Sequence, residues 1–455
     1  MAKLLFTVWP FAGHVNPAVA VGHALRARGH EVAFYTGTEA LSILAGEGFR
    51  CFPFREVDEE RIYALMRRDF SYFASLWENL RRARAFKAQL RDWLIGSVPG
   101  QLADLAAILA EWQPDVVVCE TAFWGPILVL HETGPIPVAV FSTVAACLLP
   151  GPDAPAWGRG LPRPRNRTMR LRARLERRVV KWLSADFLAA VNRLRRQYAL
   201  PPLRTSVTEF AGQLPLYLVP STPEFDYGRR DLPPSVEYVG PCLWDKACTD
   251  PPPAWLEHLP RDRPLVHVTE GTIHVHEPFL LRAVARAFED RPVQVVMTTG
   301  RHRDPAGLGL GSLPSHIRVE RYVPHSDLLP RTAVVVTMGG AGTVLAALKA
   351  GVPLVIVPTE WDKPENAQRV VEAGAGLRVE PKQCTPERVR AAVERVLREP
   401  SFRQSAQRLA EAFARYGGPA QAAERLEELA VRVPPSHGAP AVNATRGGLD
   451  GSRQV

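Results

Sequence analysis

The sequence has few of the features that mark disulfide-rich, metal-binding or membrane-spanning proteins. It has six cysteines among 455 residues, without Cys-x-x-Cys spacing, which argues against a disulfide framework and a structural zinc site. No apolar run reaches the roughly 18 residues of a membrane-spanning helix, and the apolar start MAKLLFTVWP is too short for a signal peptide. Neither an Asp-x-Asp nor a Gly-x-Ser-x-Gly motif occurs. We therefore expect a soluble, cytoplasmic protein that needs no metal, no other cofactor and no serine nucleophile.

Positive charge exceeds negative charge. Lysine and arginine number 56 against 47 acidic residues, a formal net charge of +9. A nucleic-acid-binding chain would add a recognisable module or aromatic residues among the basic ones, so we expect a basic enzyme with no nucleic-acid partner. The densest basic stretch, residues 159–181, has ten basic residues and one acidic residue. Its pattern fits a solvated basic helix, or a segment that touches anionic lipid headgroups or an acidic acceptor.

Short apolar runs alternate with helical patterns along most of the chain, which predicts an α/β fold with parallel sheets. The predicted strands of the first half are residues 4–9, 32–36, 114–120 and 136–143. Those of the second half are residues 265–268, 293–299, 317–323, 333–337 and 352–357. The first helix is expected to have Asn16 as its N-cap and Pro17 in its first turn.

Length and proline-rich segments divide the chain. Its 455 residues suit two domains of ordinary size, and Pro233-Pro234 and Pro251-Pro252-Pro253 mark a connection between them. The expected parts are a Rossmann-like domain at 1–220, a linker at 221–264, a second Rossmann-like domain at 265–416, a helix at 417–432 and a disordered tail at 433–455.

The segment Ala333–Asn366 leads from a buried strand through a glycine-rich turn into a helix, and then into a second strand. Gly339, Gly340 and Gly342 allow backbone amides to approach a ligand, and the positive end of the helix dipole favours an anion. A diphosphate suits such a turn, although a tight turn without a ligand has the same pattern. The polar group Glu360-Trp361-Asp362-Lys363 follows the second strand, where open α/β sheets place their ligands.

This segment, with Tyr322-Val323-Pro324-His325 upstream, resembles the donor-binding signature of the family 1 glycosyltransferases, especially the bacterial macrolide and natural-product branch. The resemblance covers nearly the whole chain. It implies a GT-B fold, in which two Rossmann-like domains face a cleft, the first taking the acceptor and the second the nucleotide sugar. It also implies that the helix near residues 421–429 returns to the first domain.

The activity implied by the resemblance is inverting, metal-independent transfer of a hexose or deoxyhexose to a hydroxyl of a small lipophilic acceptor. The donor, a UDP- or TDP-sugar, is a co-substrate. A monomer or a weak homodimer is expected.

The resemblance places the general base of the family at His14. From the residues alone, His14 is more simply a helix-capping or packed histidine. Glu120, at the end of the strand PDVVVCE, is the candidate group that orients the imidazole and stabilises its charged form. The family usually has aspartate there, so the longer glutamate changes the expected geometry. A capping or salt-bridging carboxylate is the alternative interpretation.

The resemblance also supplies the donor contacts. Tyr322 takes the place of the aromatic that stacks on the base, Val323 offers backbone groups to the base edge, and His325 replaces the usual glutamine. The diphosphate is expected to meet the amides of the glycine turn, the Thr343 hydroxyl and the pair Gly271-Thr272.

Two positions depart from the family pattern. Met338 replaces a histidine that donates to the diphosphate, and a thioether has no such proton. Backbone amides, Thr343 or a cation among residues 301–303 are expected to compensate. Asp362-Lys363, next to Trp361, replaces an Asp-Gln pair that holds sugar hydroxyls. Lys363 would bind a hydroxyl, favour a carboxylated sugar or pair with Asp362, so we expect altered sugar contacts rather than lost activity.

The acceptor is the least defined partner. Aromatic side chains of the first domain suit an apolar acceptor pocket, and equally a core: Phe11, Phe73, Trp77, Phe123 and Trp124.

Two other functions fit the same features. A nucleotide-sugar epimerase of the UDP-GlcNAc 2-epimerase kind shares the two-domain architecture. A non-catalytic sugar-nucleotide binder is suggested by Met338 and Lys363.

Overall fold

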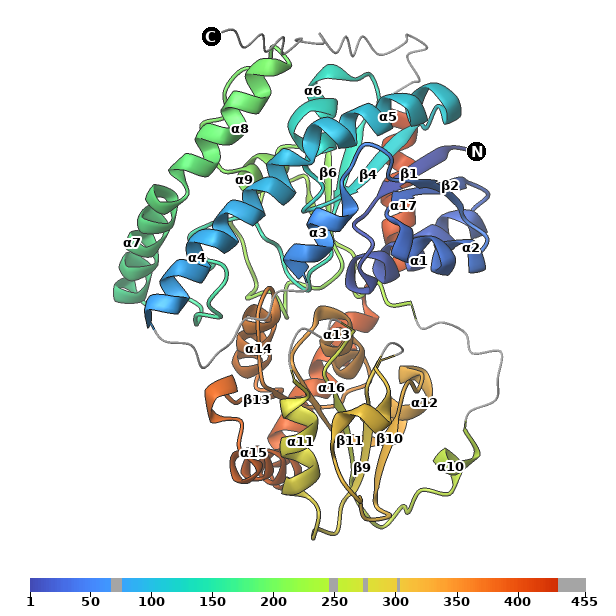
Figure 1. Ribbon diagram of the computed structural model, residues 1–455, viewed down its shortest axis with the longest axis vertical. Helices are drawn as coiled ribbons and strands as arrows, with labels where there is room; N and C mark the ends of the chain where they lie inside the picture. Colours follow the sequence, from blue (N-terminus) through green and yellow to red (C-terminus); the bar gives the residue numbers. More distant parts are fainter. Residues whose placement is uncertain (67–75, 245–252, 273–276, 301–302, 433–455) are drawn as a thin grey trace, which may run out of the picture.

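The computed structural model describes residues 1–66, 76–244, 253–272, 277–300 and 303–432. They form two lobes that are stacked along the long axis of the molecule, each with a sheet between helices (Figure 1). Strands β1 to β7 make one sheet and β8 to β13 the other, and every strand pair is parallel. The predicted α/β class with two parallel sheets is confirmed.

The first sheet has its strands in the order β3 (Arg50–Pro53), β2 (Glu31–Thr36), β1 (Lys3–Thr7), β4 (Val116–Glu120), β5 (Val138–Phe141), β6 (Leu216–Val219) and β7 (Val236–Tyr238). Its helices are α1 (Ala12–Ala27), α2 (Thr38–Gly46), α3 (Glu59–Met66), α4 (Leu76–Arg91), α5 (Val98–Trp112), α6 (His131–Thr133), α7 (Arg167–Leu183), α8 (Ala185–Gln197) and α9 (Val207–Ala211). Two π-helical turns, η1 (Asp92–Gly96) and η2 (Pro126–Leu130), interrupt them.

The second sheet has the order β10 (Ile317–Glu320), β9 (Gln294–Thr298), β8 (Leu265–Thr269), β11 (Thr332–Thr337), β12 (Leu354–Ile356) and β13 (Gly376–Arg378). The α-helices that precede or surround it are α10 (Ala254–Glu257), α11 (Phe279–Ala287), α12 (His325–Leu328), α13 (Ala341–Lys349), α14 (Lys363–Glu372), α15 (Pro386–Arg398) and α16 (Pro400–Ala414). Short 3₁₀ turns are η3 (Pro305–Leu308), η4 (Leu329–Arg331) and η5 (Pro381–Gln383), and the last helix is α17 (Pro419–Arg432).

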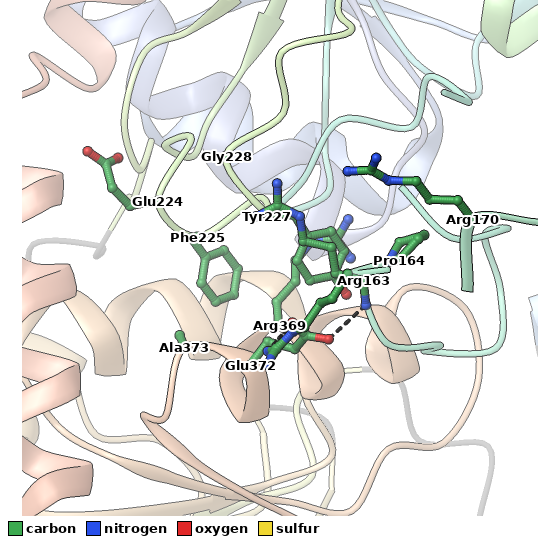
Figure 2. A pocket seen from close by; sticks show the side chains of 11 residues that line it. Arg163, Pro164, Arg170, Glu224, Phe225, Tyr227, Gly228, Arg369, Glu372 and Ala373 are labelled. Carbon is green, nitrogen blue, oxygen red and sulfur yellow. Dashed lines mark hydrogen bonds and ion pairs between the residues drawn. The ribbon is translucent and has the colours of Figure 1, made fainter. Parts of the chain in front are cut away.

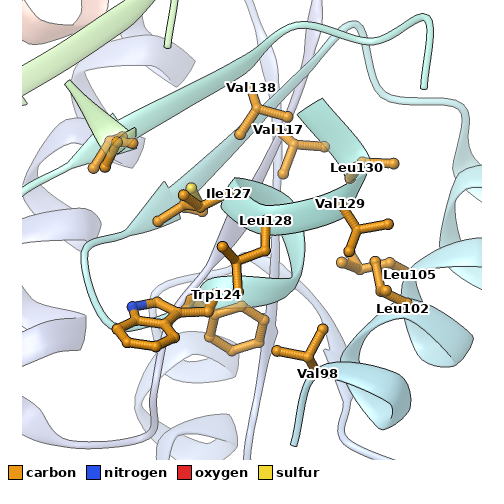
Figure 3. Packing of buried hydrophobic residues seen from close by; sticks show 14 of the residues in the cluster. Val98, Leu102, Leu105, Val117, Trp124, Ile127, Leu128, Val129, Leu130 and Val138 are labelled. Carbon is orange, nitrogen blue, oxygen red and sulfur yellow. The ribbon is translucent and has the colours of Figure 1, made fainter. Parts of the chain in front are cut away.

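Strand β4 illustrates why these sheets are made of uninterrupted apolar runs. Val117 and Cys119 join the hydrophobic core on one face of the sheet, while Val116 and Val118 join the core on the other. Successive strand residues point to opposite faces, so a sheet covered on both faces needs apolar residues at consecutive positions. Figure 3 shows part of the first core, where Val117 lies among side chains from α5 and η2.

Helix α1 begins earlier than predicted. The carbonyl of its N-cap, Phe11, accepts hydrogen bonds from the amides of His14 and Val15 at 2.8 and 2.9 Å. Pro17 therefore lies inside the helix, and the prediction that Asn16 is the N-cap is wrong. Proline cannot donate to the carbonyl four residues earlier, but that residue, Gly13, is exposed to solvent. As a result, His14 sits within the first turn of α1.

The segment 221–264 is more than the predicted linker. Its residues Val236–Tyr238 form β7, which pairs with β6 at the edge of the first sheet. The short sequence VEY has only intermediate burial, so it lacks the apolar run that identifies the central strands. The first sheet therefore extends past residue 220.

Helix α17 follows the second sheet in sequence but packs on the first. Its residues Ala422, Ala423 and Leu426 are fully buried in a core that also contains residues of α1. Figure 1 shows α17 within the upper lobe, beside α1. Helix α17 thus ties the two lobes together.

The helical stretch Arg84–Trp112 is long and apolar enough to cross a membrane by length and composition. Half of its most apolar part is buried inside the protein. Its apolar residues, including Trp93, Leu102 and Leu105, belong to the core of the first lobe, as those of a core helix do.

Candidate active site

The topology brings the predicted site residues to facing sheet edges. In the first sheet β1 pairs with β4, and the chain order reverses between them. In the second sheet β8 pairs with β11 at the corresponding reversal, and β12 pairs with β11. Ligands of open α/β sheets bind outside the carboxyl ends of strands at such switch points. The loops that follow these strands carry most of the residues singled out in the sequence.

His14 and Glu120 meet because their strands are neighbours. Nδ1 of His14 hydrogen-bonds to Oε2 of Glu120, while Oε1 of Glu120 accepts from the backbone amide of Trp9 at 3.2 Å. The Glu120 side chain has no exposed surface, and that of His14 is 24% exposed. A carboxylate on Nδ1 fixes the tautomer in which Nε2 lacks a proton. The pair therefore presents Nε2 as a proton acceptor.

Asp362, from the second lobe, acts on the same imidazole. Burial works to lower the pKa of His14, but the negative charges of Glu120 and Asp362 outweigh it and raise that pKa above the usual 6.5. Burial also raises the pKa of Asp362, against the opposing effects of Asn366, Lys363 and His14. The two lobes thus place a carboxylate from one within electrostatic reach of a histidine from the other.

The glycine-rich turn after β11 has room for a ligand. A Cβ atom added to Gly340 or Gly342 would have no heavy atom within 4 Å, whereas one added to Gly339 would lie 2.7 Å from Ile356. Gly339 also has φ of +93°, a conformation that side-chain-bearing residues rarely adopt. Gly339 is therefore needed by the fold, while Gly340 and Gly342 leave open space at the start of α13, next to the partly exposed Thr343.

Asn366 links this turn to Asp362, and the sequence interpretation did not identify it. Its Nδ2 donates to the carbonyl of Gly339 at 2.9 Å and to Oδ2 of Asp362 at 2.8 Å. The spacing of four residues between Asp362 and Asn366 is the available sequence signal, because it places both on one face of α14.

Met338 and Lys363 both contact Thr359, which follows β12. Met338 is 3% exposed, and its sulfur accepts from Thr359 Oγ1 at 3.9 Å. The ammonium of Lys363 donates to Thr359 Oγ1 at 2.8 Å and to Glu360 Oε1 at 2.7 Å. Lys363 thus pairs with Glu360 rather than with Asp362, which corrects the pairing considered from the sequence.

The expected base-binding residues lie after β10. Tyr322 is 39% exposed and Val323 is buried. His325 opens α12 and packs edge-on against His267, with ring centroids 5.9 Å apart. Burial lowers the pKa of His267 to about 3, so that ring is neutral. The partly exposed phenol ring of Tyr322 suits stacking on a flat ligand.

The loop after β8 holds Gly271, with φ of +83°, and the exposed Thr272. Of the three residues considered as compensating cations, 301 and 302 lie outside the described part of the chain. Arg303 donates to Glu270 at 2.6 Å. Glu270 in turn accepts from the amide of Leu280 at 3.1 Å, so this arginine is engaged in holding the loop to the start of α11. In the described ranges, no group of three or more His, Cys, Asp or Glu residues is placed to hold a metal ion.

Trp361 belongs to the donor loop in sequence but packs on the first lobe. Its ring lies 5.6 Å from that of Phe86 on α4 and 6.1 Å from that of Trp93 in η1. Its φ is +62°, which is costly for a bulky residue. The side chain therefore packs on the first lobe, although the sequence places Trp361 among the donor contacts.

The predicted acceptor aromatics separate into two groups. Phe11 is 7% exposed and packs edge-on against His14 at 5.5 Å, so it borders the site. Phe123 is fully buried against Trp9, and Trp124 is 7% exposed within the same core (Figure 3). These last two, which lie between β4 and η2, are core residues. Phe73 and the Trp77 side chain lie outside the described part of the chain.

A hollow of about 610 Å³, lined by none of these residues, lies between the lobes (Figure 2). One wall is Arg369 of α14, which donates to Asp226 at 2.8 and 3.0 Å. Both side chains are almost completely buried. Asp226 also accepts from Tyr238 at 2.7 Å and from the amide of Cys147 at 2.8 Å. This satisfied cluster joins the lobes and is structural.

Sequence comparisons find relatives along nearly the whole chain. A family model described as "Erythromycin biosynthesis protein CIII-like, C-terminal domain" matches residues 290–429. The 4'-demethylrebeccamycin synthase of Lentzea aerocolonigenes is 35% identical over 430 residues, which cover 94% of this chain and 99% of the relative. The demethyllactenocin mycarosyltransferase of Streptomyces fradiae is 29% identical over 436 residues, covering 94% and 87%.

Structural comparison finds similar folds. The glycotransferase of kitacinnamycin has a TM-score of 0.71 at 22% identity, over 94% of this chain and 99% of the other. The calicheamicin glycosyltransferase CalG4 has a TM-score of 0.69 at 24% identity, over 96% and 100%. The glycosyltransferase VinC, solved in complex with DTDP, has a TM-score of 0.68 at 24% identity, over 94% and 100%. At these identities the likeness establishes the shared two-lobed fold.

Proposed function

Since the chain belongs to the family 1 glycosyltransferases, in the group that includes macrolide and other natural-product enzymes, we propose that it transfers a hexose or deoxyhexose from a UDP- or TDP-sugar to a hydroxyl of a small lipophilic acceptor. Transfer proceeds with inversion and without a metal ion, and His14 is the general base. The observation that carries this proposal is the contact of His14 with Glu120 at the point where Asp362 approaches from the other lobe.

In this mechanism the acceptor hydroxyl donates its proton to Nε2 of His14 as its oxygen attacks the anomeric carbon. The bond between that carbon and the diphosphate oxygen breaks on the opposite face, which inverts the configuration. Glu120 keeps Nδ1 protonated and stabilises the imidazolium that forms. Proton transfer of this kind contributes about 10²–10⁴ in rate.

The second lobe is proposed to hold the donor. The open space at Gly340 and Gly342, with the amides at the start of α13, suits the diphosphate. Tyr322 and His325 suit the base, and Asp362, held by Asn366, suits sugar hydroxyls. Because Lys363 is directed at Thr359 and Glu360, Asp362 is the more available of the two for the sugar.

The acceptor is proposed to bind against Phe11 and Trp361, between α1 and the aromatic cluster of α4 and η1. These rings offer apolar area beside the base, which suits a hydroxylated lipophilic molecule. The similarity to proteins named 4'-demethylrebeccamycin synthase and demethyllactenocin mycarosyltransferase supports a natural product as the acceptor.

The test is a panel of UDP- and TDP-sugars incubated with the protein, first alone and then with hydroxylated macrolides, phenols and terpenoids. The expected result is slow release of the nucleoside diphosphate from one donor class, faster release with one acceptor class, and a product of inverted anomeric configuration by NMR. Conversion of UDP-GlcNAc alone to an epimer would favour the epimerase. Donor binding without turnover across the panel would favour a non-catalytic binder.

A further inference from the structure

Helix α7 has an apolar face that the described part of the chain leaves open to solvent. Figure 1 shows α7 on the outside of the upper lobe, next to the lower end of α4. Five apolar side chains, each more than half exposed, are separated by spacings that place them on one side of a helix: Leu171, Leu175, Val179, Trp182 and Leu183. We call this set the α7 stripe.

The opposite side of α7 is the one that packs on the protein. Ala173 is 4% exposed, and Arg177 donates to the carbonyls of Gly151 and Ala154 at 3.0 and 3.2 Å. Lys87 of α4 donates to the carbonyl of Leu183 at 2.6 Å, which fixes the end of the helix. Contacts on the opposite side of the helix therefore hold the α7 stripe on its outward side.

Positive charge borders the α7 stripe. The helix has seven basic residues and a single acidic one, Glu176, which pairs with Arg172 at 2.9 Å. Five basic side chains form no hydrogen bond or ion pair with the described residues: Arg167, Arg170, Arg174, Arg178 and Lys181. At about 100° per residue they follow one another along the flank of the α7 stripe.

From this arrangement we propose that α7 docks the protein on an anionic lipid surface, with the α7 stripe in the interface and the arginines on the phosphate headgroups. An amphipathic helix with an apolar face, a basic flank and a tryptophan at the boundary lies in the plane of a bilayer interface. Each basic side chain near an anionic surface adds to the attraction. A second copy of the same helix would bring like charges together, which disfavours a dimer through this face.

The segments outside the described part of the chain carry little of the negative charge that would match α7, and residues 245–252 have two aspartates and one lysine. Residues 67–75 and 433–455, which lie outside the described part of the chain, each have two arginines and one aspartate. Neither segment has the negative charge that would match the flank of α7. The docking surface is also separate from His14, so the inference does not depend on the proposed reaction.

The test is co-sedimentation of the full-length protein with phosphatidylcholine vesicles, with and without phosphatidylglycerol. We expect the partition coefficient to be about tenfold or more higher on the anionic vesicles, and to fall as salt is added. The variants Leu171→Gln/Trp182→Gln and Arg174→Gln/Arg178→Gln should each remove most of this gain. The positions are exposed, so the melting temperatures should match that of the parent.

Two matched control variants test whether the loss of vesicle binding is specific to α7. Val431→Gln removes an apolar side chain that is 78% exposed on α17, and Arg286→Gln/Arg388→Gln removes two exposed charges from the second lobe. Both should bind vesicles like the parent. The proposal is overturned if the parent protein binds anionic and neutral vesicles equally, or if the α7 variants bind anionic vesicles like the parent. It is also overturned if sedimentation shows a dimer that only the α7 variants disrupt.

Discussion

Glu120 and His14 are 106 residues apart in sequence, yet the carboxylate of one meets Nδ1 of the other. The contact exists because β1 and β4 are adjacent parallel strands whose ends meet at one sheet edge. The second oxygen of Glu120 is held by the amide of Trp9, so the carboxylate has little freedom to leave the imidazole. This is the arrangement expected of a base and the residue that positions it.

Removing the charge of Glu120 should change the pH dependence of transfer. His14 must be neutral to accept a proton, and its pKa is raised, so kcat/KM should rise with pH through a value above the usual 6.5. In Glu120→Gln this rise should move to lower pH, with kcat reduced about 10²–10⁴-fold. The measurement is kcat/KM from pH 5 to 9, with Glu111→Gln, an exposed carboxylate, as the control. An unchanged profile would show that Glu120 does not act on the base.

Gly342→Ala and Gly339→Ala should separate ligand binding from folding. A Cβ at Gly342 would have open space around it, and alanine favours the helix by about 0.5–1 kcal/mol, so stability should hold while nucleoside diphosphate affinity falls. Gly339→Ala should instead lower the melting temperature, because of its positive φ and its contact with Ile356. Calorimetric titration with UDP and TDP measures affinity, and thermal unfolding measures stability. If Gly342→Ala binds the nucleoside diphosphates as tightly as the parent protein does, the diphosphate does not bind at this turn.

Trp361 should be replaceable by glycine at a lower cost than by alanine. Both changes remove the ring contacts with Phe86 and Trp93. Only glycine also relieves the left-handed backbone, which costs other residues about 1–2 kcal/mol. Thermal unfolding of Trp361→Gly and Trp361→Ala should therefore favour glycine, and acceptor KM should rise in both. A more stable alanine variant would show that the φ of +62° is not a source of strain.

The Asp226–Arg369 pair should be a main tie between the lobes. Asp226→Asn leaves the buried guanidinium of Arg369 with less compensating charge, which typically costs about 3–5 kcal/mol. Glu427→Gln removes a partly exposed pair with Arg28, which is also distant in sequence, and should lower the free energy of unfolding far less. Urea unfolding of both variants measures the difference. A similar decrease in the free energy of unfolding in both variants would mean that the buried pair stabilises the protein no more than the exposed pair does.

The sequence was sufficient for those features that depend on strand order and local chemistry. Buried strands such as VVVCE, the glycine turn and the position of His14 after the first strand all follow from apolar runs and turn residues. The apolar pattern does not reveal β7, because VEY is only partly buried at a sheet edge. The start of α1 was misplaced because Asn16-Pro17 has the composition of a helix start, although the backbone already turns at Phe11.

Side-chain direction could not be predicted from the same patterns. Met338 precedes the glycine turn and Lys363 follows Asp362 in sequence, but their side chains contact Thr359, and that of Lys363 also contacts Glu360. Trp361 crosses to the other lobe because aromatic partners from α4 and η1 are available there. Phe123 and Trp124 follow a site strand yet enter the core. The choice of sugar, the cytoplasmic location and the oligomeric state stay predictions.

The most direct test of the account is the rate of sugar transfer by His14→Gln, measured at saturating donor and acceptor alongside nucleoside diphosphate affinity. Glutamine keeps polarity at the first turn of α1 but cannot accept the proton as imidazole does. The account predicts a transfer rate about 10²–10⁴-fold lower, with affinity for the nucleoside diphosphate unchanged. Transfer within a few-fold of the parent rate would contradict the role of His14 as the base.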